Sequence, residues 1–313
     1  MADKIATREA YGKALVEFGA QYDNLVVLDA DLAAATKTGM FKKAYPDRFF
    51  DCGIAENNMI GVAVGLALSG KIPFASSFAM FAAGRSFEQV RNSIGYPHAN
   101  VKIGATHGGI TVGEDGATHQ CLEDFALMRT VPSMTVICPA DAAEARLAVK
   151  AAIDNDGPMY LRFGRMAVPT LFGADYDFKI GRGVKLIDGT DVSVIANGVE
   201  VEQAILAAEA LKAEGISASV INMATIKPID RDIILDAAKT TGCIVTAEEH
   251  NIIGGLGSAV AEVVAEEYPV PVLRVGVEDT FGKSGPALEL LEIFGLNAQN
   301  IVAKAKRAIE LKK

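Results

Sequence analysis

Short runs of β-branched and apolar residues alternate with amphipathic helical patterns along the first half of the chain. Strands are predicted at Leu25–Leu28, Ile72–Phe74, Val101–Ile103, Thr135–Ile137 and Tyr160–Phe163. Helices are predicted at Thr7–Tyr22, Ala82–Ile94 and Ala142–Ile153. Because strands that alternate with helices usually pair in parallel, this half predicts a doubly wound α/β domain over residues 1–168.

The pattern breaks near Pro169, and residues 169–183, rich in Gly, Asp, Tyr and Phe, are predicted to be a linker. A second α/β pattern follows over residues 184–313. Its predicted strands are Asp191–Ala196, Ala218–Asn222, Cys243–Ala247 and Val272–Val275, and its predicted helices are Val201–Ala213, Asp230–Thr240, Gly257–Glu267 and Ala298–Leu311. The predicted fold class is therefore α/β, with two doubly wound domains, the first around a mainly parallel sheet.

The stretch Phe50–Gly70 combines a short extended segment, a turn and a helix built almost wholly from Gly, Ala, Val, Leu and Ile. A helix that is apolar all round is predicted to be buried on most of its circumference. Glu56 stands at the start of this helix, where an unpaired carboxylate is costly. Two interpretations follow: a carboxylate that caps the helix, or a carboxyl group that exchanges a proton with a bound heterocycle.

Composition narrows the classes of partner. The chain has 313 residues and a formal net charge of -9 without a block of Lys or Arg, so neither nucleic acid nor a membrane surface is a predicted partner. The four cysteines are scattered without metal-ligand spacing, and the N-terminus lacks an apolar signal core. These features indicate a reduced, cytoplasmic protein.

Polar residues gather where the predicted strands of the first domain end, which is where open α/β sheets bind ligands. Asp31 follows one such strand, and the run Thr106–Gln120 holds His107, Asp115 and His119 among four glycines. Histidines and a carboxylate can donate to and accept from hydroxyl groups, so the cluster suits a polyol. A metal site at the same three residues and a Gly-rich surface loop are the alternatives.

Three runs resemble the pyrimidine-binding half of transketolase: Gly53–Met59, Ser77–Phe81 and His107–Gln120. The last contains Gly-Glu-Asp-Gly-Ala-Thr-His-Gln, which is a specific motif. The similarity continues through Leu122–Asp124 and, in the second half, Glu248–Gly257, so it covers nearly the whole chain. The resemblance implies a thiamine diphosphate pyrimidine-binding domain followed by a transketolase C-terminal domain.

The resemblance also implies cofactor-binding roles. Glu56 matches the catalytic glutamate that hydrogen-bonds N1′ of the aminopyrimidine of thiamine diphosphate and shares a proton with it. Phe81, and more loosely Phe78, match aromatic residues that pack on the pyrimidine. Asp31 matches an acidic residue near the thiazolium and the subunit contact. The implied reaction transfers a two-carbon ketol unit from a ketose phosphate to an aldose phosphate, with the cofactor as electron sink.

Further residues match groups that bind the sugar phosphate substrates. His119 matches a catalytic histidine at the reacting carbonyl and hydroxyl end, and Asp115 matches the residue that reads a sugar hydroxyl. The groups matched at the phosphate end are His107, Arg165 and Arg8. Arginine suits this role because its guanidinium binds two oxygens at once.

Two departures leave the phosphate end open. The family usually has a phosphate-binding Ser four residues after the position of Asp31, and this chain has Ala35, followed by Thr36. Either Thr36 replaces that Ser or the phosphate is bound less tightly. In addition, Arg162 competes with Arg165 for the phosphate role.

The resemblance shows what this sequence lacks. Transketolases hold the diphosphate and its divalent metal with a Gly-Asp-Gly motif and a following Asn in an additional N-terminal domain, and no Gly-Asp-Gly occurs here. The chain is therefore expected to be the C-terminal subunit of a split transketolase, with a separate N-terminal subunit that binds Mg or Ca. Self-association as a dimer within a heterotetramer is expected through the Glu56 helix, where Gly61 and Gly65 leave room for another helix.

Other functions remain open at this point. Deoxyxylulose-phosphate synthase resembles the chain over Asp115–Gln120 but is expected to have an acidic residue in place of His107. The β subunit of pyruvate dehydrogenase matches Glu56 and the length but lacks the His107–Gln120 pattern. A non-catalytic pairing subunit is the third possibility, and the joint presence of Glu56, His107, Asp115 and His119 argues against it.

Overall fold

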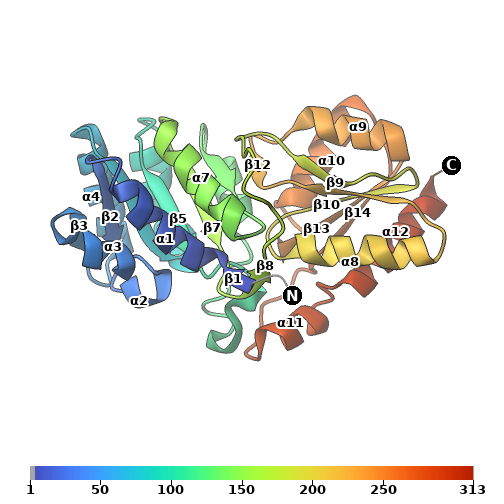
Figure 1. The fold of residues 1–313 in the computed structure, drawn as a ribbon, viewed down its shortest axis with the longest axis horizontal. Helices are drawn as coiled ribbons and strands as arrows, with labels where there is room; N and C mark the ends of the chain where they lie inside the picture. Colours follow the sequence, from blue (N-terminus) through green and yellow to red (C-terminus); the bar gives the residue numbers. More distant parts are fainter. Residues whose placement is uncertain (1–3, 313) are drawn as a thin grey trace.

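The computed structural model describes residues 4–312, so the outer ends of the two predicted domains, residues 1–3 and 313, lie outside it. Strands and helices alternate through both halves, and two sheets stand side by side with helices packed against them (Figure 1). The predicted α/β class is thereby confirmed. Among the described residues, no helix combines the length and apolarity needed to cross a membrane.

The first sheet has seven strands in the order β12-β6-β7-β5-β4-β2-β3, and every pair is parallel except β12 with β6. Its strands are β2 Leu25–Asp29, β3 Phe49–Asp51, β4 Ile72–Phe78, β5 Lys102–Thr106, β6 Thr135–Ile137, β7 Met159–Phe163 and β12 Thr225–Lys227. The edge strand β12 comes from the second half of the chain. No period-2 run predicts it, because three residues are too few to show one. A separate antiparallel pair joins β1 Lys4–Ala6 to β8 Ala167–Pro169.

Helices cover both faces of the first sheet. Apolar side chains of α1 Thr7–Gly19, α3 Gly39–Ala44 and α7 Ala142–Asp154 form the core on one face. On the other face the core is formed with α4 Glu56–Leu68 and α6 Asp124–Thr130. The short α2 Ala33–Thr36 follows β2. This layering leaves the carboxyl ends of β2, β4 and β5 free to carry a site.

The helix predicted over Ala82–Ile94 is not a regular α-helix. Two π-helical segments, Met80–Arg85 and Val90–Gly95, flank the short α5 Phe87–Gln89. Ser86 interrupts the helical geometry with φ -98° and ψ 13°, and its N–H donates to the carbonyl of Phe81 at 3.3 Å. π turns occur frequently at functional sites, and Arg85 at the end of the first segment donates from Nη1 to Oε2 of Glu56 at 2.8 Å.

The second sheet has five strands in the order β14-β13-β10-β11-β9, with only β9 antiparallel to its neighbour. Its strands are β9 Val184–Ile187, β10 Val192–Ala196, β11 Ala218–Asn222, β13 Ile244–Asn251 and β14 Val272–Val277. Its helices are α8 Glu200–Ala213 and α12 Ala298–Leu311 on one face, α9 Arg231–Thr241 and α10 Leu256–Glu267 on the other, and α11 Ala287–Ile293 against the first domain. Residues 170–183 contain neither helix nor strand.

Helix α4 is buried on one face only, which corrects the prediction of burial around most of its circumference. Its buried residues are Glu56, Met59, Ile60 and Ala63, whereas Leu68 is 75% exposed. A Cβ added at Gly61 or Gly65 would meet no atom within 4 Å. The helix is apolar all round, but this chain covers only the side that faces the sheet.

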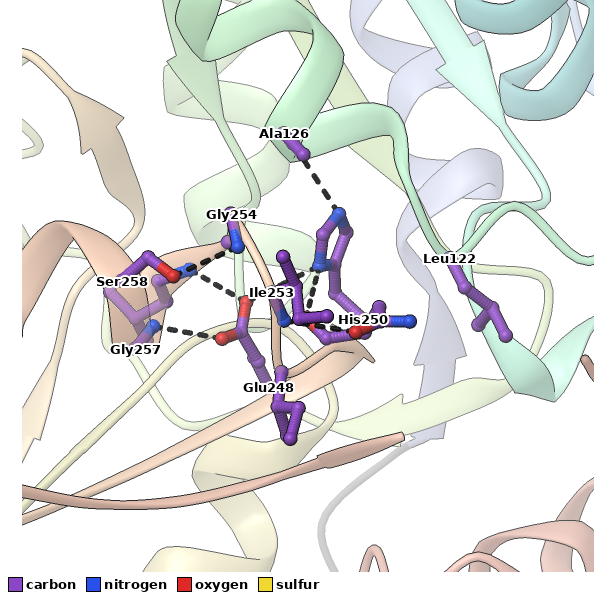
Figure 2. Close-up of polar contacts among 12 residues, drawn as sticks. Leu122, Ala126, Glu248, His250, Ile253, Gly254, Gly257 and Ser258 are labelled. Atoms are coloured by element: carbon purple, nitrogen blue, oxygen red, sulfur yellow. Dashed lines mark hydrogen bonds and ion pairs between the residues drawn. The ribbon is translucent and has the colours of Figure 1, made fainter. Parts of the chain in front are cut away.

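Backbone and ring contacts join the two halves of the molecule near α6. The imidazole of His250 on β13 stacks on Phe125 with ring centroids 5.0 Å apart, and its Nε2 accepts the N–H of Ala126 at 3.4 Å (Figure 2). The N–H of Asn251 donates to the carbonyl of Leu122 at 2.9 Å. Because both partners are buried or backbone groups, these contacts hold the second domain in one position against the first.

Candidate active site

The candidate site lies beyond the carboxyl ends of two neighbouring strands. Phe78 is the last residue of β4 and Thr106 the last of β5, and the parallel register places them opposite each other. His107 follows directly, in a left-handed conformation with φ 57°. The parallel pairing of two strands 24 or more residues apart therefore brings the Phe78 and His107 segments to one edge of the sheet.

Four of the predicted residues form one group of rings. Phe78 stacks on His107 with centroids 3.9 Å apart and on Phe81 at 5.9 Å. The edge of His119 meets Phe81 at 5.4 Å, and its Nδ1 lies 2.9 Å from the hydroxyl of Thr118. Phe78 is buried and packs inside the group, whereas Phe81 is half-buried and leaves part of its ring accessible to a ligand.

Glu56 is a buried carboxylate with a specific cationic partner. Its side chain is 2% exposed, and its Oε2 lies 2.8 Å from Nη1 of Arg85. The guanidinium of Arg85 also stands 4.7 Å above the ring of Phe81. Ala55, not Glu56, is the N-cap of α4, and no side-chain capping bond is made there. Glu56 stands in the first turn, where the helix N-terminus favours its negative charge, so the ion pair with Arg85 is added to that interaction. Arg85 was not among the residues predicted for the site, although its position four residues after Phe81 on a helical pattern indicates a shared face.

A neutral imidazole stands among cations at the other end of the group. Nη1 of Arg8 lies 2.9 Å from Nε2 of His107, and since a guanidinium can only donate, Nε2 accepts and Nδ1–H donates to the hydroxyl of Thr106 at 2.8 Å. The pKa of His107 is lowered to about 3, mainly by burial and then by electrostatic interaction with Arg8, Arg165, His119 and Lys37, in that order. His107 is therefore uncharged at neutral pH.

Arg165 joins this positively charged end. Its Nη1 donates to the carbonyl of Val112 and to Oε2 of Glu114, the latter at 2.8 Å. Burial and the nearby Arg165 lower the pKa of Arg8, as expected for two cations that share one space. Lys37 contributes to the same field and was missed by the sequence analysis, because an isolated lysine carries no pattern.

Asp115 and Asp31 lie outside the ring group. Asp115 is exposed on the same loop as His119, and Asp31 is exposed in the turn after β2 with φ 62°. Neither carboxylate makes a hydrogen bond or ion pair within residues 4–312. The alternative metal reading of His107, Asp115 and His119 is not supported, because these residues form no cluster suited to a metal ion in the described part of the chain.

Neither Thr36 nor Arg162 offers a free group at the phosphate end, so for the position of the family's Ser the weaker phosphate contact remains the expectation. The hydroxyl of Thr36 is fully buried and donates to Oδ2 of Asp29 at 2.7 Å, so it faces the interior. Arg162 is 3% exposed, with its Nε 3.3 Å from Oδ2 of Asp124 and its guanidinium 4.4 Å from the ring of Phe125. Arg165 is thus the arginine of the pair with access to a ligand.

Comparison with known proteins gives an independent result. The profile of the transketolase pyrimidine binding domain matches residues 3–170, and that of the transketolase C-terminal domain matches residues 181–301. A solved structure titled as a split gene transketolase, inactive beta4 tetramer, is 56% identical and superposes with a TM-score of 0.92 over 99% of this chain and 100% of that one.

Curated relatives agree with these matches. A protein of Methanocaldococcus jannaschii that carries the provisional name of transketolase C-terminal section is 51% identical, over 97% of this chain and 95% of its own. A 6-deoxy-6-sulfo-D-fructose transketolase subunit from Clostridium sp. is 44% identical over 97% of this chain and 95% of its own. With two family profiles that together match most of its length, the chain belongs to the transketolase family and corresponds to its pyrimidine-binding and C-terminal domains.

Proposed function

We propose that this chain supplies the pyrimidine-binding and sugar-binding residues of a split transketolase. The enzyme would transfer a two-carbon ketol unit from a ketose phosphate to an aldose phosphate. One observation supports the proposal most directly: a buried acid, a group of rings and a group of cations lie next to one another in space, in that order. Glu56 pairs with Arg85, Arg85 covers Phe81, and Phe78 links Phe81 to His107. This order suits a heterocycle beside the acid and an anionic sugar terminus beside the cations.

The family implies thiamine diphosphate, and the residues of this chain fit its aminopyrimidine ring. Glu56 engages Arg85 through Oε2, and within the described residues its Oε1 has no hydrogen-bond partner. That oxygen is free to share a proton with ring nitrogen N1′ in a site screened from water. Phe81 would pack against the ring. When bound, the cofactor supplies the electron sink for cleavage of the ketose C2–C3 bond.

The remaining site residues would act on the sugar. His119 is placed to move a proton at the reacting hydroxyl, since it stands at the edge of Phe81. His107 is neutral and can only accept or donate a hydrogen bond, which leaves charge neutralisation of the phosphate to Arg8 and Arg165. Asp115 is exposed on the same loop and would bind a hydroxyl. A relative named for a 6-sulfo sugar supports an anionic substrate terminus.

The diphosphate and its divalent metal, Mg or Ca, would be held by a separate N-terminal subunit. The names of two relatives support this, one described as a transketolase subunit and one as a split gene transketolase. Asp31, exposed beyond β2, would lie at this contact near the thiazolium.

The chain would also associate with itself through α4, as a dimer within a heterotetramer. The exposed face of α4 combines Gly61, Val62, Gly65 and Leu68, and Ile54 just before it is 77% exposed. Exposed apolar residues this close together mark an interaction surface. A related chain is titled as a beta4 tetramer, which supports self-association of this kind of subunit.

Cofactor binding should depend on the partner. Calorimetry of the isolated chain with thiamine diphosphate and magnesium should detect weak binding or none, because the pyrimidine pocket alone offers few contacts to the ligand. Addition of the N-terminal subunit should restore tight binding. Tight binding by the isolated chain would contradict the split-subunit proposal.

The exposed face of α4 should govern assembly. Sedimentation at micromolar concentration should show the unmodified chain as a dimer or larger, and Gly65→Glu should shift it toward the monomer by placing a charge in an apolar contact. Lys212→Glu on exposed α8 is the control and should leave the assembly unchanged. A monomeric unmodified chain would exclude this face as a self-contact.

Arg165→Ala should selectively weaken the binding of phosphorylated acceptors and so raise their KM. Loss of a charge-assisted contact costs about 1.5–3 kcal/mol, which is roughly ten- to a hundredfold in KM. The KM of a non-phosphorylated acceptor such as glycolaldehyde should hardly change in the reconstituted enzyme. Glu114→Gln removes the ion-pair partner of Arg165 and serves as control for loop effects. Equal losses with both acceptors would show that Arg165 does not meet the phosphate.

Glu56→Gln should abolish cofactor activation and leave the fold intact. The amide keeps the shape of the side chain but cannot share a proton, so exchange of the cofactor C2 proton should slow by about 10²-fold or more. NMR after deuterium quench measures this exchange in the reconstituted enzyme. Glu88→Gln at an exposed position of the short helix α5 is the control. Exchange at the unmodified rate in Glu56→Gln would remove the catalytic role of Glu56.

A further inference from the structure

The loop that carries Asp115 and His119 is held by both domains, and in its own domain the guanidinium of Arg165 donates to the carbonyl of Val112. Within its own domain the loop is closed at its base, where the N–H of Gly109 donates to the carbonyl of Cys121 at 2.9 Å. Its middle, the 3₁₀ segment Ile110–Asp115, packs against α11 of the second domain. The contacts that set the path of this loop therefore come from both domains.

Glu249 on β13 makes the most direct of these contacts. Its side chain is 7% exposed, and its Oε1 accepts the backbone N–H of Thr111. A Cβ at Gly109 would lie 2.2 Å from Cδ of Glu249, and Gly109 has φ 87°. Only glycine fits this position, because both the space and the backbone conformation exclude a side chain. The carboxylate thus fits closely against the first turn of the loop.

A second segment of the C-terminal domain holds the far end of the loop. Nε2 of Gln120 donates to the carbonyl of Lys283 at 2.8 Å, as well as to the carbonyls of Ile110 and Gly113 within the loop. Gly116 lies against Ser284, whose Oγ is 2.3 Å from where a Cβ would stand. Gln120 is the residue next to His119, so this contact borders the proposed catalytic histidine directly.

We propose that Glu249 is a positioning residue for the transfer reaction: its carboxylate anchors the amide of Thr111 and so holds the loop in the conformation that presents His119 and Asp115. The kinetic part rests on the proposed function, whereas the structural part does not. The C-terminal domain then contributes to the chemistry through the loop, although none of its described side chains makes a ring contact with Phe78, Phe81, His107 or His119. Without the anchor the loop populates other conformations, and turnover falls with the competent fraction.

The neighbouring Glu248 provides a matched control. It lies on the same strand, is fully buried and also accepts backbone N–H groups, from Leu256 at 2.6 Å and Gly257 at 2.8 Å at the start of α10 (Figure 2). Among the described residues it makes no hydrogen bond or ion pair to the loop. Loss of Glu248 therefore removes a comparable set of interactions from the same domain and leaves the Thr111 anchor in place.

The first test measures amide hydrogen exchange at Thr111 in the isolated chain. Glu249→Ala should raise the hydrogen-exchange rate of this amide by roughly ten- to a hundredfold, because the variant loses a hydrogen bond to a charged group. Glu249→Asp, whose side chain is shorter by one methylene, should also raise the exchange rate of the Thr111 amide. This variant replaces the alanine variant if the latter fails to fold. Glu249→Gln should keep the protection, because its amide oxygen still accepts. Unchanged protection in Glu249→Asp, or equal exposure in Glu248→Ala, would overturn the anchor.

The second test measures steady-state kinetics of the reconstituted enzyme. Glu249→Asp should lower kcat about tenfold or more with a smaller change in KM, Glu249→Gln should restore most of kcat, and Glu248→Ala should match the unmodified enzyme. Full kcat in a variant whose Thr111 amide is exposed would overturn the positioning role. If the unmodified enzyme shows no ketol transfer, the proposed function fails, and the exchange experiment still decides whether Glu249 anchors the loop.

Discussion

A single buried guanidinium links the parts of this molecule that must keep a fixed arrangement. Arg162 is 3% exposed; its Nε faces Asp124 at 3.3 Å, and its Nη2 donates to the carbonyls of Cys121 at 3.1 Å and Glu249 at 2.8 Å. Asp124 is held in turn by the hydroxyl of Tyr160 at 2.8 Å. A charge in the interior is tolerated only when it is paired and hydrogen-bonded. Its partners lie on α6, at the base of the loop and on β13, so the cost of burial is offset only when these three segments meet.

This junction joins the second domain to the loop that carries His119. The loop with His119 begins and ends beside the partners of Arg162, and its path between them is set by Glu249 and Gln120. Interiors are packed closely enough that a displaced strand cannot leave the loop unchanged. The geometry of the loop in the site therefore depends on the position of the second domain relative to the first.

The candidate site has a negatively charged end and a positively charged end. The negative charge of Glu56 stands at one end beside Arg85, and Arg8, Arg165 and Lys37 act together at the other, around His107. The rings between them keep the two ends apart. Because burial and these cations lower the pKa of His107, its imidazole stays neutral over the physiological pH range and cannot repel them.

Helix α4 carries a residue of the candidate site and an uncovered apolar face on opposite sides. Glu56 begins the helix and is buried with Met59, Ile60 and Ala63 on the side that faces the sheet. Val62 and Leu68 are exposed on the other side. The position of the acid is therefore set by packing within this chain, whereas the outward face of the same helix is left open to solvent.

The sequence by itself determined the alternation of strands and helices, the irregular segment between the two halves, and the residue types at the strand ends. It did so because burial imposes a period of 2 or 3.6 on apolar positions and because ligands bind where parallel strands end. Glu56, Phe78, Phe81, His107 and His119 could be singled out in this way, supported by the family motifs.

Only the tertiary structure decided the pairings that cross between segments. Arg85 as the partner of Glu56, Arg162 as an interior ion and the strand β12 in the first sheet all depend on contacts between residues far apart in the chain. Periodicity describes which face of one element is buried and carries no information about what it is buried against. The anchoring of the loop by the second domain belongs to the same class, because it arises from two separately predicted units meeting in space.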